Sequence, residues 1–242
     1  MTNPNLKRSF PKYSSLKNTL RFKPIVLSAK TRRLRKALTI EDLRAIARRR
    51  TPRGPFDYTD GAAESESSLT RARDTYKNIE FVPNILRDVS HLNTGCTILG
   101  ENFDLPFGIA PTGFTRMMNA EGEIAGAKAA KKFGIPFVLS TLGTTSIEDV
   151  VQSAPEGRNW FQLYMWKDRD RSMGLVERAN KAGFEALVLT VDVPVAGARL
   201  RDVRNGMTIP PSLTSKTILN ADRKSTRLNS SHVSESRMPS SA

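Results

Sequence analysis

The sequence predicts an α/β fold consisting of the first four strand–helix units of a TIM (β/α)8 barrel, with a basic, partly helical N-terminal extension. Short apolar runs alternate with helical segments, the pattern of a parallel sheet covered by helices. The runs end at Ala110, Ser140, Tyr164 and Thr190, so their ends are 30, 24 and 26 residues apart. Polar residues stand at these ends, where a barrel carries its functional groups.

Two other α/β arrangements are disfavoured. No G-x-G-x-x-G motif follows a predicted strand, as a dinucleotide-binding sheet requires, and no P-loop is present. The 242 residues would nearly suit a whole barrel of about 250 residues, but only four units can be counted and no fifth strand follows Asp202. We therefore predict a truncated barrel with an unpaired sheet edge.

Residues 1–38 form a basic arm. They contain eleven Lys and Arg and no acidic residue, and they account for most of the net charge of +14. Such a segment is expected to be exposed. It could be a solvated or oligomer-contacting extension, a segment attracted to an anionic membrane surface, or a transit peptide. Nucleic-acid binding is disfavoured, because no aromatic-interleaved motif accompanies the charge.

The elements follow in order. Thr39 ahead of two acidic residues starts a helix that should stop near Thr51, a second helix is expected over 61–78, and a short hairpin near 97–100. The predicted strands are 106–110, 136–140, 160–164 and 186–191. The predicted helices between and after them are 121–133, 146–153 and 171–182.

The last 21 residues, 222–242, are excluded from the predicted fold. They contain seven serines and only four apolar side chains, with no strand or helix period. They resemble a translated sequencing adaptor or vector read-through, and a natural disordered tail is the alternative.

Composition excludes several classes of protein. The single cysteine, Cys96, excludes an internal disulfide framework and a Cys-rich zinc site. Two histidines, His91 and His232, leave little scope for metal binding, so no metal site is expected. No run approaches the ~18 apolar residues that a membrane-spanning helix needs.

Several short motifs occur in a fixed order between these elements. They are FDYTDGAAE at 56–64, LPFGIAPTG at 105–113, FQLY at 161–164, LTVDVP at 189–194, GAR at 197–199 and DVRNG at 202–206. Together they resemble the FMN-dependent α-hydroxy-acid oxidases and dehydrogenases, which include glycolate oxidase, L-lactate dehydrogenase or oxidase, and mandelate dehydrogenase. The resemblance implies that residues 39–221 are the N-terminal half of such a domain.

The resemblance implies FMN as the cofactor and places its contacts at the strand ends, on Ala110, Pro111, Thr112, Ser140, Gln162 and Thr190. Backbone groups of the first three would lie near the flavin N5, and the last three would bind the isoalloxazine edge. A flavin needs donors for N5, O4 and O2 and an acceptor for N3–H. Taken singly, the last three could instead cap loops or satisfy a buried carbonyl.

The substrate implied by the resemblance is a small 2-hydroxy carboxylate resembling lactate, oxidised to the 2-keto acid. Arg199 and Tyr58 match residues that contact the carboxylate, and a guanidinium can hold two oxygens at once. Tyr164 matches a tyrosine that hydrogen-bonds the substrate hydroxyl. Asp192 matches a carboxylate beside the catalytic base, although an aspartate at this position could also be a loop cap.

The catalytic histidine of the family, together with a second arginine and a lysine, would follow the fourth strand, and none is found in this chain. Neither His91 nor His232 matches the base, so the chain alone is expected to be inactive. The electron acceptor is left open, and the full-length parent is expected to be a homo-oligomer. We expect a cytoplasmic protein, peripheral to the inner face of the membrane if the arm contacts lipid. A membrane- or nucleic-acid-binding module and a non-flavin barrel enzyme are the alternatives.

Overall fold

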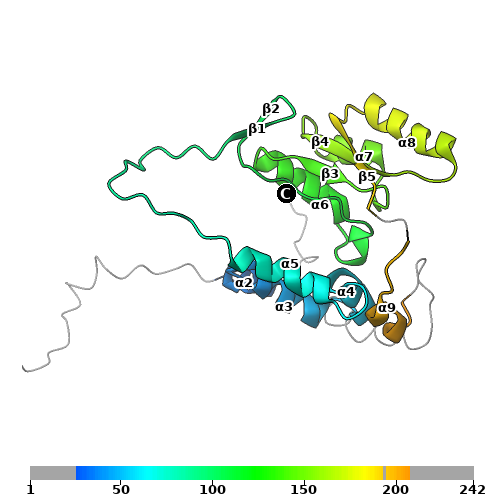
Figure 1. Cartoon of the computed structure of the whole chain (residues 1–242), viewed down its shortest axis with the longest axis horizontal. Coiled ribbons are helices and arrows are strands. Elements are labelled where there is room, and N and C mark those ends of the chain that lie inside the picture. Colours follow the sequence, from blue (N-terminus) through cyan, green and yellow to red (C-terminus); the bar gives the residue numbers. More distant parts are fainter. Residues whose placement is uncertain (1–25, 193–194, 208–242) are drawn as a thin grey trace, which may run out of the picture. The chain divides into compact units, whose positions relative to one another are not determined.

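The structure, a computed structural model, describes residues 26–192 and 195–207 (Figure 1). Its main sheet is formed by parallel strands. Three strands form a sheet in the order β3 (Phe137–Leu139), β4 (Asn159–Tyr164) and β5 (Ala186–Thr190). Leu139 pairs with Phe161, and Tyr164 pairs with Thr190. The carboxyl ends of the three strands therefore meet at one edge of the sheet, as the sequence predicts.

The first predicted strand, 106–110, is wrong in extent. Only Ile109 forms a parallel bridge, with Phe137, held by the Ile109 N–H on Pro136 O (2.9 Å) and the Val138 N–H on Ile109 O (3.0 Å). Prolines on both sides of the run lack the N–H that a ladder needs. A Cβ at Gly108 would lie 2.8 Å from Pro136 O, so the close approach of the two chains requires glycine there.

Three helices alternate with the strands: α6 (Gly122–Lys132), α7 (Ile147–Ser153) and α8 (Arg169–Lys181). These bounds confirm the predicted helices to within two residues. Ser146 accepts a hydrogen bond from the Asp149 N–H, and Asp168 accepts one from the Arg171 N–H. Such side-chain caps satisfy backbone donors that have no partner inside the helix, and they fix where α7 and α8 begin.

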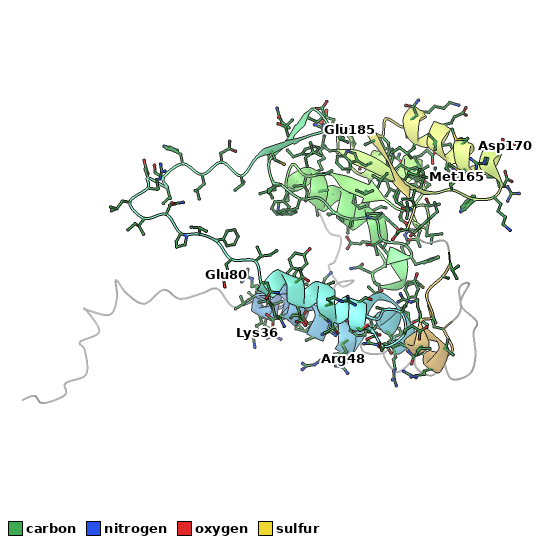
Figure 2. The ribbon with its side chains drawn as sticks, in the orientation of Figure 1. Lys36, Arg48, Glu80, Met165, Asp170 and Glu185 are labelled. Carbon is green, nitrogen blue, oxygen red and sulfur yellow. The ribbon has the colours of Figure 1, made fainter. Side chains whose placement is uncertain are left out.

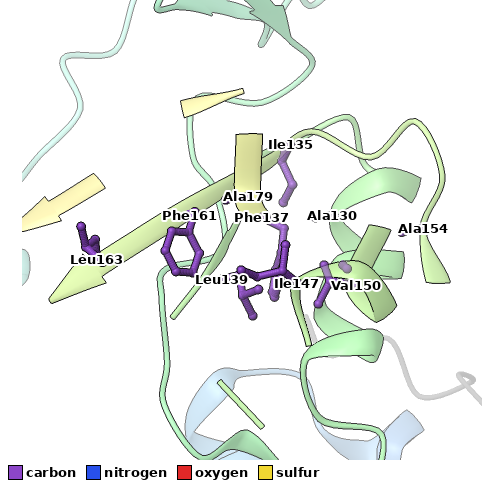
Figure 3. Close-up of a cluster of buried hydrophobic side chains, with 11 residues drawn as sticks. Ala130, Ile135, Phe137, Leu139, Ile147, Val150, Ala154, Phe161, Leu163 and Ala179 are labelled. Atoms are coloured by element: carbon purple, nitrogen blue, oxygen red, sulfur yellow. The ribbon is translucent and has the colours of Figure 1, made fainter. Parts of the chain in front are cut away.

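The core lies between this sheet and its helices (Figure 3). All three residues of β3 are buried; β4 and the Ile109 bridge flank its two edges, and α6 packs against it. The cluster consists of Ala127, Ala130, Ile135, Phe137, Leu139, Ile147, Val150, Ala154, Phe161, Leu163 and Ala179. Phe161 also meets Phe184 edge to face, with ring centroids 6.2 Å apart.

Strand β5 is the outer strand of the described sheet. Leu187 and Leu189 are each half exposed on it, and no strand among the described residues pairs with its far side. The predicted unpaired edge is therefore present in the part of the chain that the structure describes.

The predicted hairpin is confirmed as β1 (Cys96–Ile98) paired antiparallel with β2 (Glu101–Phe103). Leu99 and Gly100 both have positive φ, 55° and 84°, as a two-residue type I′ turn requires. Between α5 and β1, residues 78–95 form no helix or strand and are exposed; Figure 2 shows the side chains along the extended segment beyond Glu80.

The helix predicted over 61–78 begins later than expected. Helix α4 (Arg53–Asp60) ends just before Gly61, and α5 (Ser67–Lys77) starts six residues after it. Gly61 is extended, and Glu64 and Glu66 have positive φ, which a continuous helix does not allow. Helix α9 (Leu200–Asn205) packs against α4.

The chain divides into two compact units between Arg50 and Thr51. The described part of the first unit holds α2 (Ala29–Lys36) and α3 (Ile40–Arg50), and α3 confirms the helix predicted from Thr39. Helix α2 was not predicted in the basic arm, but no residue of it is buried, so this part is exposed as expected. Residues 1–25 and the predicted tail 222–242 lie outside the described residues. None of the described helices combines the length and the apolar character needed to cross a membrane.

Leu139→Ala should lower the free energy of unfolding by about 2–5 kcal/mol, because it leaves a cavity in the centre of the cluster. Leu139 is 1% exposed. Leu187→Ala removes the same atoms from a half-exposed site, so it should cost less than about 1 kcal/mol. Urea denaturation of both variants checks this, and equal losses would contradict the assigned core.

Candidate functional site

A buried amide connects the carboxyl ends of the three strands. Gln162, 2% exposed, accepts hydrogen bonds at Oε1 from the Ser140 hydroxyl (3.2 Å) and the Thr141 N–H (3.1 Å). Its Nε2 donates to Thr190 Oγ1 (2.7 Å). A backbone N–H can only donate, so its contact with Oε1 fixes the orientation of the amide. The structure thus brings together the three residues predicted to bind the isoalloxazine edge.

Three further hydrogen bonds connect this row to the loop after β3. The Ser140 hydroxyl accepts from the Leu142 N–H (3.1 Å). The Thr141 hydroxyl donates to the Gln162 carbonyl (2.6 Å) and accepts from the Tyr164 N–H (3.0 Å). Tyr164, at the end of β4, is half-buried, and its hydroxyl has no hydrogen-bond partner among the described residues.

The segment Ala110–Thr112 follows the Ile109 bridge and is exposed. The N–H groups of Ala110 and Thr112 make no hydrogen bond within the described residues, and Pro111 has no N–H. The next residues return to the loop after β3, where the Phe114 N–H donates to Leu142 O (3.0 Å). Free backbone donors therefore stand beside the polar row, where the sequence predicts contacts near flavin N5.

Tyr58 and Arg199 lie together in the same unit. The Arg199 guanidinium stacks on the Tyr58 ring, 4.7 Å from its centroid, and Nη2 donates to the Tyr58 and Gly61 carbonyls. Its Nε donates to Asp202 Oδ2 at 2.7 Å. Nη1 has no hydrogen-bond partner among the described residues, so one edge of the guanidinium is available.

The Tyr58 hydroxyl is held in its neutral form. Burial raises the pKa of Tyr58 above its ordinary value; Arg199 opposes this shift, whereas Asp202 and Tyr164 add to it. The Tyr58 ring also meets Phe114 edge to face, with centroids 6.2 Å apart. Tyr58, on which Arg199 stacks, is therefore close enough to Tyr164 at the end of β4 to feel its charge, and it contacts Phe114 in the loop after Ala110–Thr112.

Asp192 is not brought into this arrangement. It is exposed in the segment just after β5, and no described residue forms a hydrogen bond or ion pair with its carboxylate. His91, which is the one histidine among the described residues, is also exposed and lies before the hairpin. His91 therefore offers no base at the strand ends, whereas Asp192, predicted to stand beside the base, lies just after the end of β5.

Sequence reasoning missed Glu123. It lies in the first turn of α6 and is 3% exposed. Its carboxylate accepts from the Thr144 N–H (2.7 Å) and from the hydroxyls of Thr144 (2.8 Å) and Thr145 (2.7 Å). An acidic residue in a first turn is common on exposed helices, so the sequence carries no signal of burial.

Although burial would raise the pKa of Glu123, hydrogen bonds from the Thr144 N–H and from neighbouring threonine hydroxyls lower it to about 2. The carboxylate is therefore charged throughout the ordinary pH range, and its charge is stabilised by hydrogen-bond donors.

The donors and acceptors at the strand ends fit the edge of a flavin. Gln162 keeps a second amide hydrogen, and Thr190 accepts from Gln162 and so keeps its own hydroxyl hydrogen. With the free N–H groups of Ala110 and Thr112, these groups offer donors for flavin oxygens and N5, and hydroxyl oxygens that can accept from N3–H. A parallel sheet with such a polar carboxyl edge has the arrangement of the site-bearing rim of a barrel enzyme.

Comparison with known proteins agrees with this class. The family of FMN-dependent dehydrogenases matches residues 47–241. The chain belongs to this family, whose cofactor is FMN. A protein of Mycobacterium tuberculosis provisionally named an L-lactate dehydrogenase is 60% identical over 216 residues, which cover 89% of this chain and 52% of that protein.

Solved structures give the same result. The structure of (S)-mandelate dehydrogenase, described as a monotopic membrane protein, superposes with a TM-score of 0.75 at 37% identity, covering 84% of this chain and 54% of that one. A mandelate oxidase variant solved with an FMN adduct superposes with a TM-score of 0.66 at 39% identity, covering 72% and 51%. The chain spans about half the length of the curated relatives it matches.

Glu123→Gln should lower the free energy of unfolding at neutral pH by about 2–3 kcal/mol, because donors that face the carboxylate lose a charged acceptor. Because folding lowers the pKa from 4.5 to about 2, the stabilisation is complete above pH 4.5 and is lost as the pH falls towards 2. The difference between the wild type and the variant should therefore shrink over that range.

Denaturant titrations from pH 7 to pH 3 measure this difference. Glu121→Gln is the matched control, because Glu121 is exposed two residues earlier and should show no such dependence. A gap between wild type and Glu123→Gln that is constant with pH would contradict the assigned hydrogen bonds.

Proposed function

We propose that this chain provides the cofactor-edge half of an FMN-dependent enzyme that oxidises a lactate-like L-2-hydroxy acid to the 2-keto acid. The observation that carries the proposal is the hydrogen-bonded row Ser140–Gln162–Thr190 at the carboxyl ends of three parallel strands. Membership of the FMN-dependent dehydrogenase family and the relative named for L-lactate support it. When bound, FMN supplies the acceptor, at N5, for the hydride or electrons that leave the substrate.

The chain's own residues orient the two reactants. Gln162 and Thr190 donate to the polar edge of the isoalloxazine, and Ser140 holds the Gln162 amide in the required orientation. The backbone at Ala110, Pro111 and Thr112 faces the N5 side. These groups are fixed by the strand ends before the ligand arrives, so little ordering is needed on binding.

The acid is held by groups of opposite charge and matched shape. Arg199 offers Nη1 to the carboxylate, with the neutral Tyr58 hydroxyl beside it. Tyr164 contributes a hydroxyl without a described partner, suited to the substrate hydroxyl. Asp192, exposed just after β5, is proposed to stand beside the base that removes the hydroxyl proton.

The 242 residues by themselves are proposed to be inactive. The exposed His91 does not stand at the strand ends, and His232 lies outside the described residues. Loss of a general base alone lowers a rate by about 10²–10⁴-fold.

Anaerobic L-lactate should bleach the visible flavin absorption of the longer gene product, and it should leave the FMN-saturated 242-residue chain unbleached. Titration of flavin fluorescence establishes FMN saturation of both. Bleaching of the short chain would contradict its inactivity, whereas a longer product that binds no FMN would contradict the proposed function itself. D-lactate is the matched control for the L configuration.

A specific observation favours a second role for the N-terminal unit, binding of an anionic membrane surface. Helix α2 carries five Lys and Arg in eight residues and no acidic residue. Leu27, Leu34 and Leu38, in and beside it, are 86%, 48% and 87% exposed. Exposed leucines among cations suit a lipid interface better than nucleic acid. The protein is then cytoplasmic and peripheral to the inner face of the membrane.

Comparing vesicles with and without an anionic lipid tests this role. The full chain should co-sediment with vesicles containing phosphatidylglycerol, but not with phosphatidylcholine vesicles, and less strongly as salt rises. Each cation near such a surface contributes about 1 kcal/mol, so Arg32→Gln with Arg35→Gln should weaken binding by tenfold or more. Arg71→Gln with Arg73→Gln, on exposed positions of α5, removes the same charge and is the matched control.

Equal losses for the two double variants would overturn the assignment to α2. Binding of duplex DNA in preference to vesicles would point to a nucleic-acid partner instead.

A further inference from the structure

Glu123 is a buried charged group that the proposed reaction does not use. Its carboxylate is 3% exposed, yet none of the described lysines, arginines or histidines forms an ion pair with it. A buried charge without a counter-ion is costly unless hydrogen bonds compensate it. Here the compensation comes mainly from the loop after β3 and from the N-terminus of α6, where Glu123 itself stands, and Thr115 also lowers the pKa of Glu123.

The Glu123 carboxylate determines the path of that loop. It holds the N–H and hydroxyl of Thr144 and the hydroxyl of Thr145, which is 7% exposed. The loop is tight: a Cβ at Gly143 would lie 3.0 Å from both the Leu139 side chain and Ser140 O. Anchoring Thr144 therefore constrains Ser140, the first member of the strand-end row.

The same anchor reaches the loop that follows Ala110–Thr112. The Arg116 N–H donates to Thr144 Oγ1 (3.3 Å), and the Phe114 N–H donates to Leu142 O (3.0 Å). Because the Thr144 hydroxyl accepts from Arg116, its single hydrogen is left for Glu123. The chain of contacts runs from Glu123 through Thr144 to both loops that carry candidate FMN contacts.

We propose that Glu123 is a positioning residue for FMN: its buried carboxylate holds the loops 110–117 and 140–145 in the arrangement that presents Ala110–Thr112 and Ser140 to the flavin. This inference rests on the proposed function, and it adds a residue that touches neither cofactor nor substrate. A glutamine replaces the carboxylate poorly, because it carries no charge and its NH₂ group would face the Thr144 donors or require the Thr145 hydroxyl to turn and accept.

Amide hydrogen exchange in the FMN-free chain tests the mechanical part. In Glu123→Gln the N–H groups of Phe114, Arg116, Leu142 and Thr144 should lose protection together, by about tenfold or more, while those of β4 keep theirs. Glu121→Gln, exposed on the same turn, should leave all of them unchanged. A loss confined to Thr144 would overturn the coupling of the two loops.

FMN affinity tests the functional part. Flavin fluorescence titration should give an FMN dissociation constant that is larger by about tenfold or more for Glu123→Gln than for Glu121→Gln. Both variants are titrated without denaturant, under conditions where both are folded. If Glu123→Gln does not fold, Thr145→Val removes one donor and keeps the charge, and it should raise the constant by a smaller factor.

Unchanged FMN affinity in both Glu123→Gln and Thr145→Val would overturn the role of Glu123 and leave the proposed function standing. Absence of FMN binding by the unsubstituted chain would overturn this inference, whereas the proposed function itself is overturned only if the longer gene product also binds no FMN.

Discussion

The Gln162 side chain sits inside a parallel sheet, where an amide is tolerated only if each of its polar atoms finds a partner. Those partners lie on the strands to either side, Ser140 and Thr141 next to β3 and Thr190 on β5. Since the donor on Thr141 is a backbone N–H, a shift of one strand against its neighbour would leave buried groups unpaired. The hydrogen-bond requirement of one side chain therefore fixes the relative heights of three strand ends, and with them the geometry of the candidate cofactor edge.

A second buried polar group, the Glu123 carboxylate, fixes the loops that follow the strands. Glu123 approaches from α6 and holds Thr144 and Thr145, so a helix, a loop and the end of β3 share one set of contacts. Gln162 Oε1 and the Glu123 carboxylate both accept hydrogen bonds from backbone N–H groups and from short hydroxyl side chains, which have little freedom to rearrange. Rigid presentation of this kind suits a cofactor that must be held in a defined orientation, because no binding free energy is then spent on ordering the site.

The exposed edge of β5 bears on what this chain contributes to its family. A parallel barrel strand is apolar on both faces because the barrel interior and the outer helices cover it. Leu187 and Leu189, two residues apart and so on one face of β5, are apolar and half exposed. The chain spans about half the length of the relatives it matches. The candidate flavin contacts lie in this chain, together with Arg199 and Tyr58, which stack on each other.

Sequence alone determined the order of strands and helices, since apolar runs and helical periods depend on neighbouring residues, and the strand ends at Ser140, Tyr164 and Thr190 followed from the same pattern. It overestimated the strand at 106–110 and the helix from Gly61, because a close approach to Pro136 and positive φ angles at Glu64 and Glu66 are properties of the folded chain. Tertiary structure decided which polar residues meet. The burial of Glu123 and the stacking of Arg199 on Tyr58 arise from contacts between distant segments, which composition and periodicity do not encode.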